Sequence, residues 1–351
     1  MEAAAADLKQ CPPEHREWVD RLRHGGSMPL STIHQLDTVS NSWACPPGDL
    51  FHVRGADYMK NKTKVPAGDW LLRPLAFEFL QASSPISHFM NHPQCRVRAA
   101  LDAALPAATA TDPSQPQHAP FVWVLNFQLG QKTHHSMVSY FASFSSPPPG
   151  SLMQKFLDGD DAYRSSHLKV LLRFPEAPRL VQMVVGERWP ICLLAKVVTC
   201  NYIKGKNYIE IDVNSESSVL ARTAVKLTFG LSPLIVSDIA FLLEGNHPDE
   251  LPERILGAVR LNKLDAASAP FIDMSLVSQG NGLNSKHLPT QMFVNDLKPE
   301  ATQGGKIANN KQVSKGRSTM KLSKIWSATS VKDLGKETSE PKRSAHAEEE
   351  E

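Results

Sequence analysis

Alternating apolar and polar positions dominate the middle of the chain and predict a domain rich in β-strands. Residues 121–129 are apolar at every odd position, and the even positions change from Val122 and Val124 to Asn126 and Gln128. This pattern is typical of a strand that is buried on both faces at its start and on one face at its end. Residues 134–144 follow a short turn at Gly130, so the two segments are predicted to form a hairpin. Further strands are predicted at residues 51–58, 71–79, 179–185, 193–199, 208–213 and 258–264.

One long helix is predicted at residues 217–243. Small or polar residues recur there at steps of three or four, leaving the rest of the cylinder apolar. They are Arg222, Lys226, Gly230, Pro233 and Ser237. Pro233 is expected to kink this helix. Shorter helices are predicted at residues 13–23, 151–157 and 251–256. The whole pattern predicts an α+β fold in which an antiparallel sheet packs against a long apolar helix.

Composition divides the chain into three parts. Residues 1–40 form a leader with a short helix, and residues 41–270 carry the packed domain. Residues 271–351 are poor in apolar side chains and are predicted to be a disordered, charge-segregated tail. Within that tail, residues 305–332 hold seven basic residues and no acid, whereas the end of the chain holds four glutamates.

Charge and cysteine content restrict the cellular setting. The net charge of +2 provides no general attraction for nucleic acid, and no nucleic-acid partner is expected. The five widely spaced cysteines include no CxxC pair, which favours reduced thiols in a reducing compartment. No signal or transit peptide is recognisable, and the charge-free run 227–237 is too short to span a bilayer. The sequence therefore predicts a cytoplasmic protein, either soluble or peripherally bound to a membrane.

Known catalytic motifs are missing from the sequence, so no enzyme, cofactor or metal site is expected. HExxH, GxGxxG, Walker A and GxSxG patterns do not occur. Asp158, Asp160 and Asp161 suggest a cation loop, but the twelfth position from Asp158 is Lys169, not glutamate. We interpret them as residues of a turn. A hydrolase that uses His134 and Asp160 is the least favoured alternative.

Glu210 and Asp212 lie two apart on a predicted strand, so their side chains point to the same face. We expect this face to be exposed to solvent, with the carboxylates paired to Lys196 or Lys204. His134 and His135 are neighbours on another strand and point to opposite faces, so they cannot serve one site together.

A basic loop is the best candidate for binding anions or lipid headgroups. It contains Arg54, Tyr58, Lys60, Lys62 and Lys64. The alternatives are an ordinary solvated hairpin and, for Arg54, an internal hydrogen-bonded pair. A second candidate lies in the tail, where Lys321, Lys324 and Trp326 belong to a weakly amphipathic segment suited to a membrane surface. The alternative there is a tail that only increases solubility.

Several ordered motifs resemble the C-terminal domain of the plant Enhanced Disease Resistance proteins. They include the segments 51–55, 126–128, 156–161, 200–213 and 251–260, and together they cover about residues 43–265. In that family the domain often follows a pleckstrin-homology domain and a START lipid-binding domain. The resemblance therefore implies a lipid- or membrane-linked regulatory context, such as defence regulation in plants or algae. The 40 residues before the domain are too few for either of those two domains.

These observations lead to two functional hypotheses of different classes. The first is a non-catalytic, lipid- or membrane-associated regulatory module. Its ligand would lie between the sheet and the predicted long helix, and anionic phospholipid would be its membrane partner. The second is a protein-interaction scaffold that recruits partners through its basic tail.

Overall fold

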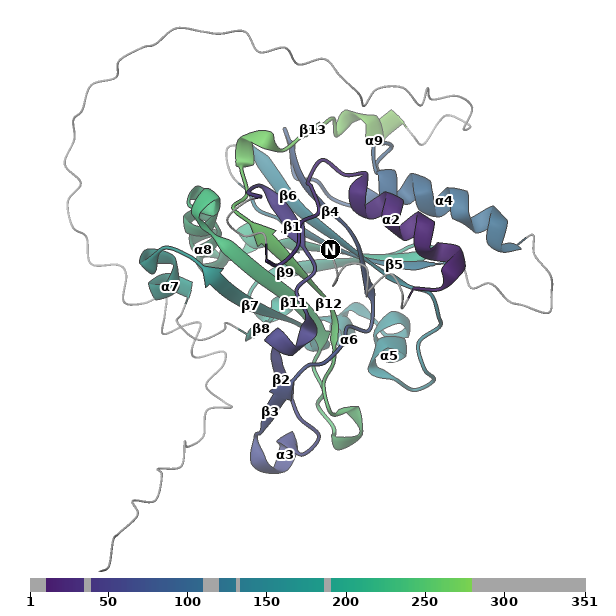
Figure 1. Cartoon of the computed structure of the whole chain (residues 1–351), viewed down its shortest axis with the longest axis vertical. Helices are drawn as coiled ribbons and strands as arrows, with labels where there is room; N and C mark the ends of the chain where they lie inside the picture. The colour runs from purple at the N-terminus through teal and green to yellow at the C-terminus, as the bar shows by residue number, and fades with distance from the viewer. Residues whose placement is uncertain (1–10, 35–38, 110–119, 131–132, 186–190, 280–351) are drawn as a thin grey trace, which may run out of the picture.

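The computed structural model in Figure 1 describes residues 11–34, 39–109, 120–130, 133–185 and 191–279. Its helices are α2 (Arg16–His24), α3 (Tyr58–Asn61), α4 (Arg96–Thr109), α5 (Leu152–Asp158), α6 (Asp161–His167), α7 (Arg179–Val185), α8 (Val219–Gly230) and α9 (Ser275–Gln279). Its longer strands are β4 (Arg73–Ala82), β5 (Phe121–Gln128), β6 (His134–Ser143), β7 (Leu168–Glu176), β9 (Thr199–Lys204), β10 (Tyr208–Asn214), β11 (Val236–Leu243) and β12 (Ile255–Asn262). Short strands complete the sheets, namely β1 (Ser42–Ala44), β2 (His52–Arg54), β3 (Lys64–Pro66), β8 (Ile191–Leu193) and β13 (Phe271–Ile272).

Two main sheets form the body of the protein. One has six strands in the order β13-β4-β6-β5-β10-β9, and the other has five in the order β1-β12-β11-β7-β8. Most neighbours are antiparallel, but β10 runs parallel to β5 and β13 runs parallel to β4. The β5–β6 hairpin is confirmed, with Phe121 opposite Ser143 and Gln128 opposite Ser136.

The inner faces of the two sheets share one apolar core. Phe141 of β6 lies 5.8 Å from Phe241 of β11 between ring centroids, and Phe127 of β5 lies 5.9 Å from the same ring. Gly257 of β12 leaves space for the Phe141 ring of the other sheet, because an added Cβ would lie 2.4 Å from that ring. A side chain at this position would therefore push the two sheets apart.

Other elements cover the outer faces. A second apolar cluster covers the outer face of the six-stranded sheet, with Trp18 and Val19 of α2, Val97 and Leu101 of α4, and the segment that contains Phe89. A third cluster covers the five-stranded sheet beneath the β2–β3 hairpin. In Figure 1, α2 and α4 lie to the right of the sheets, whereas α7 and α8 lie together on the left.

The predicted α+β class is confirmed in its coarse form, but the long helix over residues 217–243 is wrong. The helix ends at Gly230, a short 3-10 turn (Ser232–Leu234) contains Pro233, and β11 follows from Val236. β11 lies between β7 and β12 in the sheet, and both of its faces are buried: Ile239 and Phe241 belong to the core between the sheets, and Ala240 and Leu242 belong to the cluster beneath the β2–β3 hairpin. A fully covered strand is almost continuously apolar, and it therefore cannot be distinguished from a buried helix by periodicity alone.

Three shorter predictions also differ from the structure. Residues 179–185 form the helix α7, not a strand, and residues 251–256 form no helix but lead into β12. The segment 193–199 contains only the end of β8, a 3-10 turn (Leu194–Lys196) and the first residue of β9. None of the helices that the structure describes is long and apolar enough to cross a membrane. The predicted disordered tail lies outside the described residues from position 280 onward.

Candidate functional site

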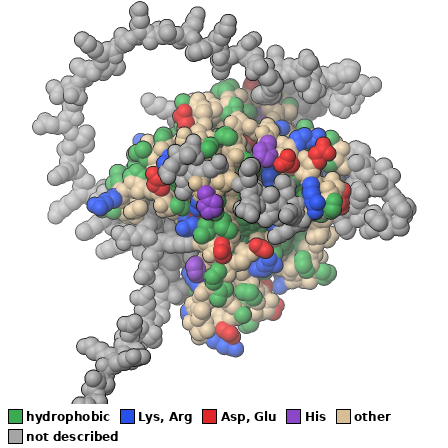
Figure 2. Space-filling model, in the orientation of Figure 1, with side chains coloured by type: hydrophobic (Ala, Val, Ile, Leu, Met, Phe, Trp, Pro, Cys, Tyr) green, Lys and Arg blue, Asp and Glu red, His purple; other side chains and the backbone are tan. Residues whose placement is uncertain are grey.

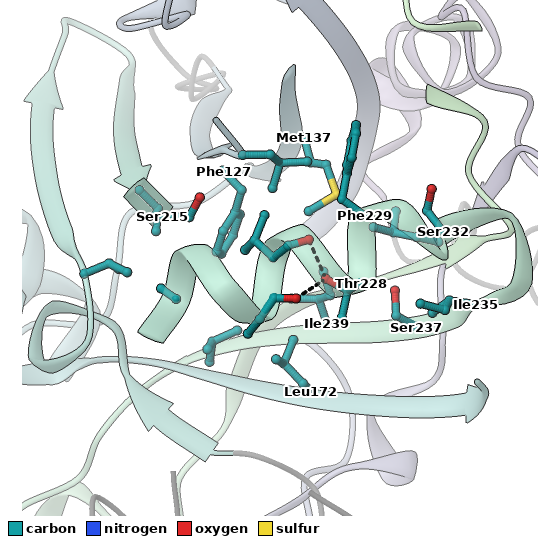
Figure 3. Close-up of a pocket in the computed structure, with 18 of the residues that line it drawn as sticks. Phe127, Met137, Leu172, Ser215, Thr228, Phe229, Ser232, Ile235, Ser237 and Ile239 are labelled. Atoms are coloured by element: carbon teal, nitrogen blue, oxygen red, sulfur yellow. Dashed lines mark hydrogen bonds between the residues drawn. The ribbon is translucent and has the colours of Figure 1, made fainter. Parts of the chain in front are cut away.

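An apolar cavity of about 200 Å³ lies between the inner faces of the two sheets, against α8 (Figure 3). The six-stranded sheet contributes Phe127 and Met137 to its wall, and the five-stranded sheet contributes Leu172 and Ile239. The cavity is therefore lined by segments that are distant in the sequence.

Helix α8 provides one side of the cavity. Ser218 caps its first turn, with the side-chain hydroxyl accepting a hydrogen bond from the Ala221 backbone N–H at 3.4 Å. The cavity-lining residues recur at helical spacing on one face of this helix. They are Ala221, Ala224, Val225, Thr228 and Phe229. Because two of the five are alanines, this face of the helix leaves space that larger side chains would fill.

The cavity wall contains no charged side chain among the residues that the structure describes. Three of its four described hydroxyl side chains donate hydrogen bonds to backbone carbonyl oxygens of the protein. Thr228 donates to the carbonyl oxygens of Ala224 and Val225, Ser215 donates to Gln128 O at 2.7 Å, and Ser232 donates to Leu264 O at 2.9 Å. The wall is therefore suited to hydrocarbon, since an ionic group placed there would be desolvated without a countercharge.

The volume of the cavity limits its occupant. An apolar cavity of roughly 150 Å³ stays free of water and accepts a benzene-sized molecule. Pockets for drug-sized ligands usually measure about 300–1,000 Å³. At about 200 Å³, this cavity has room for part of one hydrocarbon chain and not for a complete two-chain lipid.

Part of the cavity wall went unnoticed in the sequence. Val170, Leu172 and Phe174 of β7 line the cavity, and they alternate along the strand. This alternation was the signal that could have identified β7. Helix α4 was missed as well, although its arginines and alanines are good helix formers.

The five residues of the basic loop fall into two groups, of which one faces inward and the other is exposed. Arg54 and Tyr58 point inward: Arg54 lies 3.5 Å from Glu244 and 3.8 Å from Glu253, and its guanidinium stacks 4.9 Å from the centroid of the buried Tyr58 ring. Arg54 thus forms the internal pair that was the alternative interpretation, and neither side chain presents an open anion-binding surface.

The three lysines of this loop are exposed on the β2–β3 hairpin and α3. Lys60 lies 3.5 Å from Asp57, and the Lys62 ammonium lies 5.1 Å from the centroid of the Tyr58 ring. Lys64 belongs to β3, and its side chain is exposed. Anion binding by these lysines stays a prediction. Lys321, Lys324 and Trp326 lie outside the described residues, so their membrane contact also stays a prediction.

The prediction that Glu210 and Asp212 face solvent is wrong. Both carboxylates are buried on the outer face of β10 beneath the segment around Phe89. Glu210 accepts hydrogen bonds from the backbone N–H groups of Phe89 at 2.7 Å and Met90 at 2.9 Å. Asp212 accepts from His88 N–H at 3.0 Å and from the Asn126 amide at 2.8 Å.

Burial raises the pKa of Glu210 to about 8, with the neighbouring Asp212 carboxylate as the second cause. Burial also raises the pKa of Asp212, because its charged form is desolvated. The pair therefore fastens a loop to the sheet and does not contact Lys196 or Lys204. It lies on the face of the six-stranded sheet opposite the cavity, since Ile209 and Ile211 occupy the inner face.

The aspartates near Gly159 act as turn and cap residues. Asp160 caps α6 and accepts the Tyr163 backbone N–H at 2.7 Å, and Asp161 pairs with Arg164 at 2.8 Å. His134 begins β6, and neither it nor Asp160 lines the cavity. Within the described residues, no group of His, Cys, Asp and Glu side chains is arranged to hold a metal ion.

Comparison with known proteins identifies one family. The family model described as "Protein ENHANCED DISEASE RESISTANCE 2, C-terminal" matches residues 43–265. A protein of Arabidopsis thaliana described as "Protein ENHANCED DISEASE RESISTANCE 2-like" is 36% identical over 233 residues, which is 66% of this chain and 30% of that protein. The chain thus matches less than a third of its relative's length. No solved structure matches it.

Proposed function

This chain belongs to the family of the Enhanced Disease Resistance 2 C-terminal domain, and we propose that the domain binds one hydrocarbon chain of a lipid without altering it chemically. The observation that supports this proposal best is the cavity of about 200 Å³ with no charged side chain in its described wall. The hydrocarbon would lie against α8 and between the sheets, and the polar headgroup would remain outside the cavity.

The positions of the polar groups favour binding over catalysis. Glu210 and Asp212 hold backbone N–H groups of the loop that covers them, and they are separated from the cavity by the six-stranded sheet. Asp238 is fully buried and accepts hydrogen bonds from Arg173 and Arg260. These carboxylates are already used to hold the fold together, so we propose a module that is not an enzyme.

The relative's printed name links that protein to disease resistance. For this chain, a regulatory role in defence and a cytoplasmic or peripheral membrane location are part of the same proposal. The alternative function, recruitment of a protein partner through the tail, concerns residues outside the described part of the chain and stays a prediction.

A fluorescent fatty acid tests the proposed function. Its emission is expected to rise when the full chain is added, and unlabelled fatty acid should reverse the rise by displacement. Ala224→Leu is expected to weaken uptake because its side chain fills part of the cavity. Ala99→Leu makes the same change on the exposed face of α4 and should leave uptake unchanged. If the unmodified chain takes up no fatty acid, or both variants bind as it does, the proposal is wrong.

A further inference from the structure

Three large apolar side chains are exposed on adjoining segments. Leu180 and Met183 of α7 are 49% and 67% exposed, and Leu234, in the 3-10 turn after α8, is 56% exposed. The two segments are neighbours because Val181 of α7 packs against Ile235 in a small buried cluster. We refer to Leu180, Met183 and Leu234 together as the apolar rim. A single exposed leucine needs no explanation, whereas a group on one edge indicates an interaction surface.

The apolar rim lies over a buried cluster that also borders the cavity. Ile235 is part of the buried cluster beneath the rim, Phe174 packs against that cluster, and both residues also line the cavity. Leu227 and Leu231, at the end of α8, pack against the same cluster. One thickness of side chains therefore separates the exposed rim from the space between the sheets.

Exposed cations flank the rim. Arg179 directly precedes Leu180, and the exposed Lys226 of α8 directly precedes Leu227, which packs against the cluster beneath the rim. The nearby Glu176 is already paired with Lys263 at 3.2 Å. In Figure 2 the left edge of the molecule, where Figure 1 places α7 and α8, carries hydrophobic and basic side chains next to one another, with an acidic side chain among them. Apolar side chains beside Lys and Arg match the layering of a phospholipid surface, with acyl chains beneath anionic phosphates.

We propose that the apolar rim is the surface through which the domain docks on an anionic phospholipid bilayer. Leu180, Met183 and Leu234 enter the interface, and the flanking cations contact phosphate groups. The inference rests on the proposed function, because a lipid chain that leaves the bilayer at the rim would reach the cavity past Ile235 and Phe174.

Vesicle flotation of the full chain tests the docking surface. The vesicles are made of phosphatidylcholine, either alone or mixed with phosphatidylserine. The single variants Leu180→Glu and Met183→Glu are each expected to bind the mixed vesicles at least tenfold more weakly, since burying either side chain in hydrocarbon is worth about that factor or more. Val219→Glu is the matched control for each of them, because it adds the same single charge at a side chain that is 76% exposed at the opposite end of α8, and glutamate suits a helix N-terminus.

The outcomes separate docking from cavity binding. Loss of vesicle binding in the two rim variants, with Val219→Glu unchanged and an equal thermal midpoint, supports the rim. Equal weakening in Val219→Glu shows that added negative charge alone is responsible, and this overturns the proposal, as does unchanged binding in the rim variants. Fatty-acid uptake from solution is measured on the same samples. If the unmodified chain takes up no fatty acid, the proposed function fails, and the vesicle comparison still decides whether the rim docks.

Discussion

Filling the cavity should stabilise the protein if the space between the sheets is empty and apolar. Ala224 lines the cavity and is 8% exposed. Leucine adds three carbons, each worth about 0.8 kcal/mol when buried, so Ala224→Leu gains at most about 2.4 kcal/mol. The whole cavity of about 200 Å³ corresponds to about 5 kcal/mol of missing packing energy at roughly 24 cal/mol per Å³. Leucine and alanine have similar helix propensities, so α8 itself should tolerate the change.

Thermal unfolding measures this gain. For a domain of this size, 1 kcal/mol shifts the midpoint by about 2–4 °C, so Ala224→Leu should raise it by about 5–10 °C. Ala99→Leu is the control, because its side chain on α4 stays in solvent and gains little burial. A midpoint at or below that of the unmodified chain for Ala224→Leu would show that the cavity is filled or rigidly closed. An equal rise in both variants would attribute the effect to helix propensity.

Three further predictions concern the framework and the cavity wall. The raised pKa of Glu210 means that the folded protein holds a proton that the unfolded chain releases above about pH 4.5. The stability that comes from this proton is fully present below pH 4.5 and is lost as the pH rises through about 8. Glu210→Gln should therefore flatten the pH dependence of the urea midpoint. Asp238→Ala leaves the buried Arg260 guanidinium without its carboxylate and should lower the free energy of unfolding by about 3–5 kcal/mol in urea titration. An effect below about 1 kcal/mol would contradict the structural role of this ion pair. Burial raises the pKa of Cys192 to about 12, so its alkylation by iodoacetamide at pH 8 should be far slower than that of an unperturbed thiol, and fatty acid should slow it further, as followed by peptide mass spectrometry.

Local patterns predicted several elements well. The hairpin of β5 and β6, the strand β10 and the helix α5 with its Ser151 cap follow from alternation, turn residues and capping. These features depend on residues that are close in sequence. The motifs also identified the family, because their order and spacing extend over the whole of residues 43–265.

Local sequence patterns did not predict which strands pair when they are distant in the sequence. Nothing near Tyr208 indicates that β10 will pair in parallel with β5, where its partner Val122 lies 86 residues earlier. The alternation of β10 was recognised, but the loop that buries Glu210 and Asp212 comes from residues around Phe89. The sequence therefore shows that two carboxylates share a face, and only the tertiary structure decides whether that face meets water.

A ligand site was expected between one sheet and a long helix kinked at Pro233, and the structure contains no such helix over the described residues 217–243. The structure instead forms the cavity from a short helix that ends at Gly230, with Ala221 and Ala224 facing the strands, and from a second sheet that includes β11. Small residues at helical spacing were the available signal, but they gain meaning only when the opposing strands are known.

Methyl NMR of the chain labelled at methionine provides the most direct measurement of the central claim. Met137 lines the cavity, whereas Met90 is buried in the separate cluster on the outer face of the six-stranded sheet. Titration with a fatty acid is predicted to shift the Met137 methyl signal in a saturable way and to leave the Met90 signal in place. An unmoved Met137 signal, or equal shifts at both methionines, would contradict hydrocarbon binding between the two sheets.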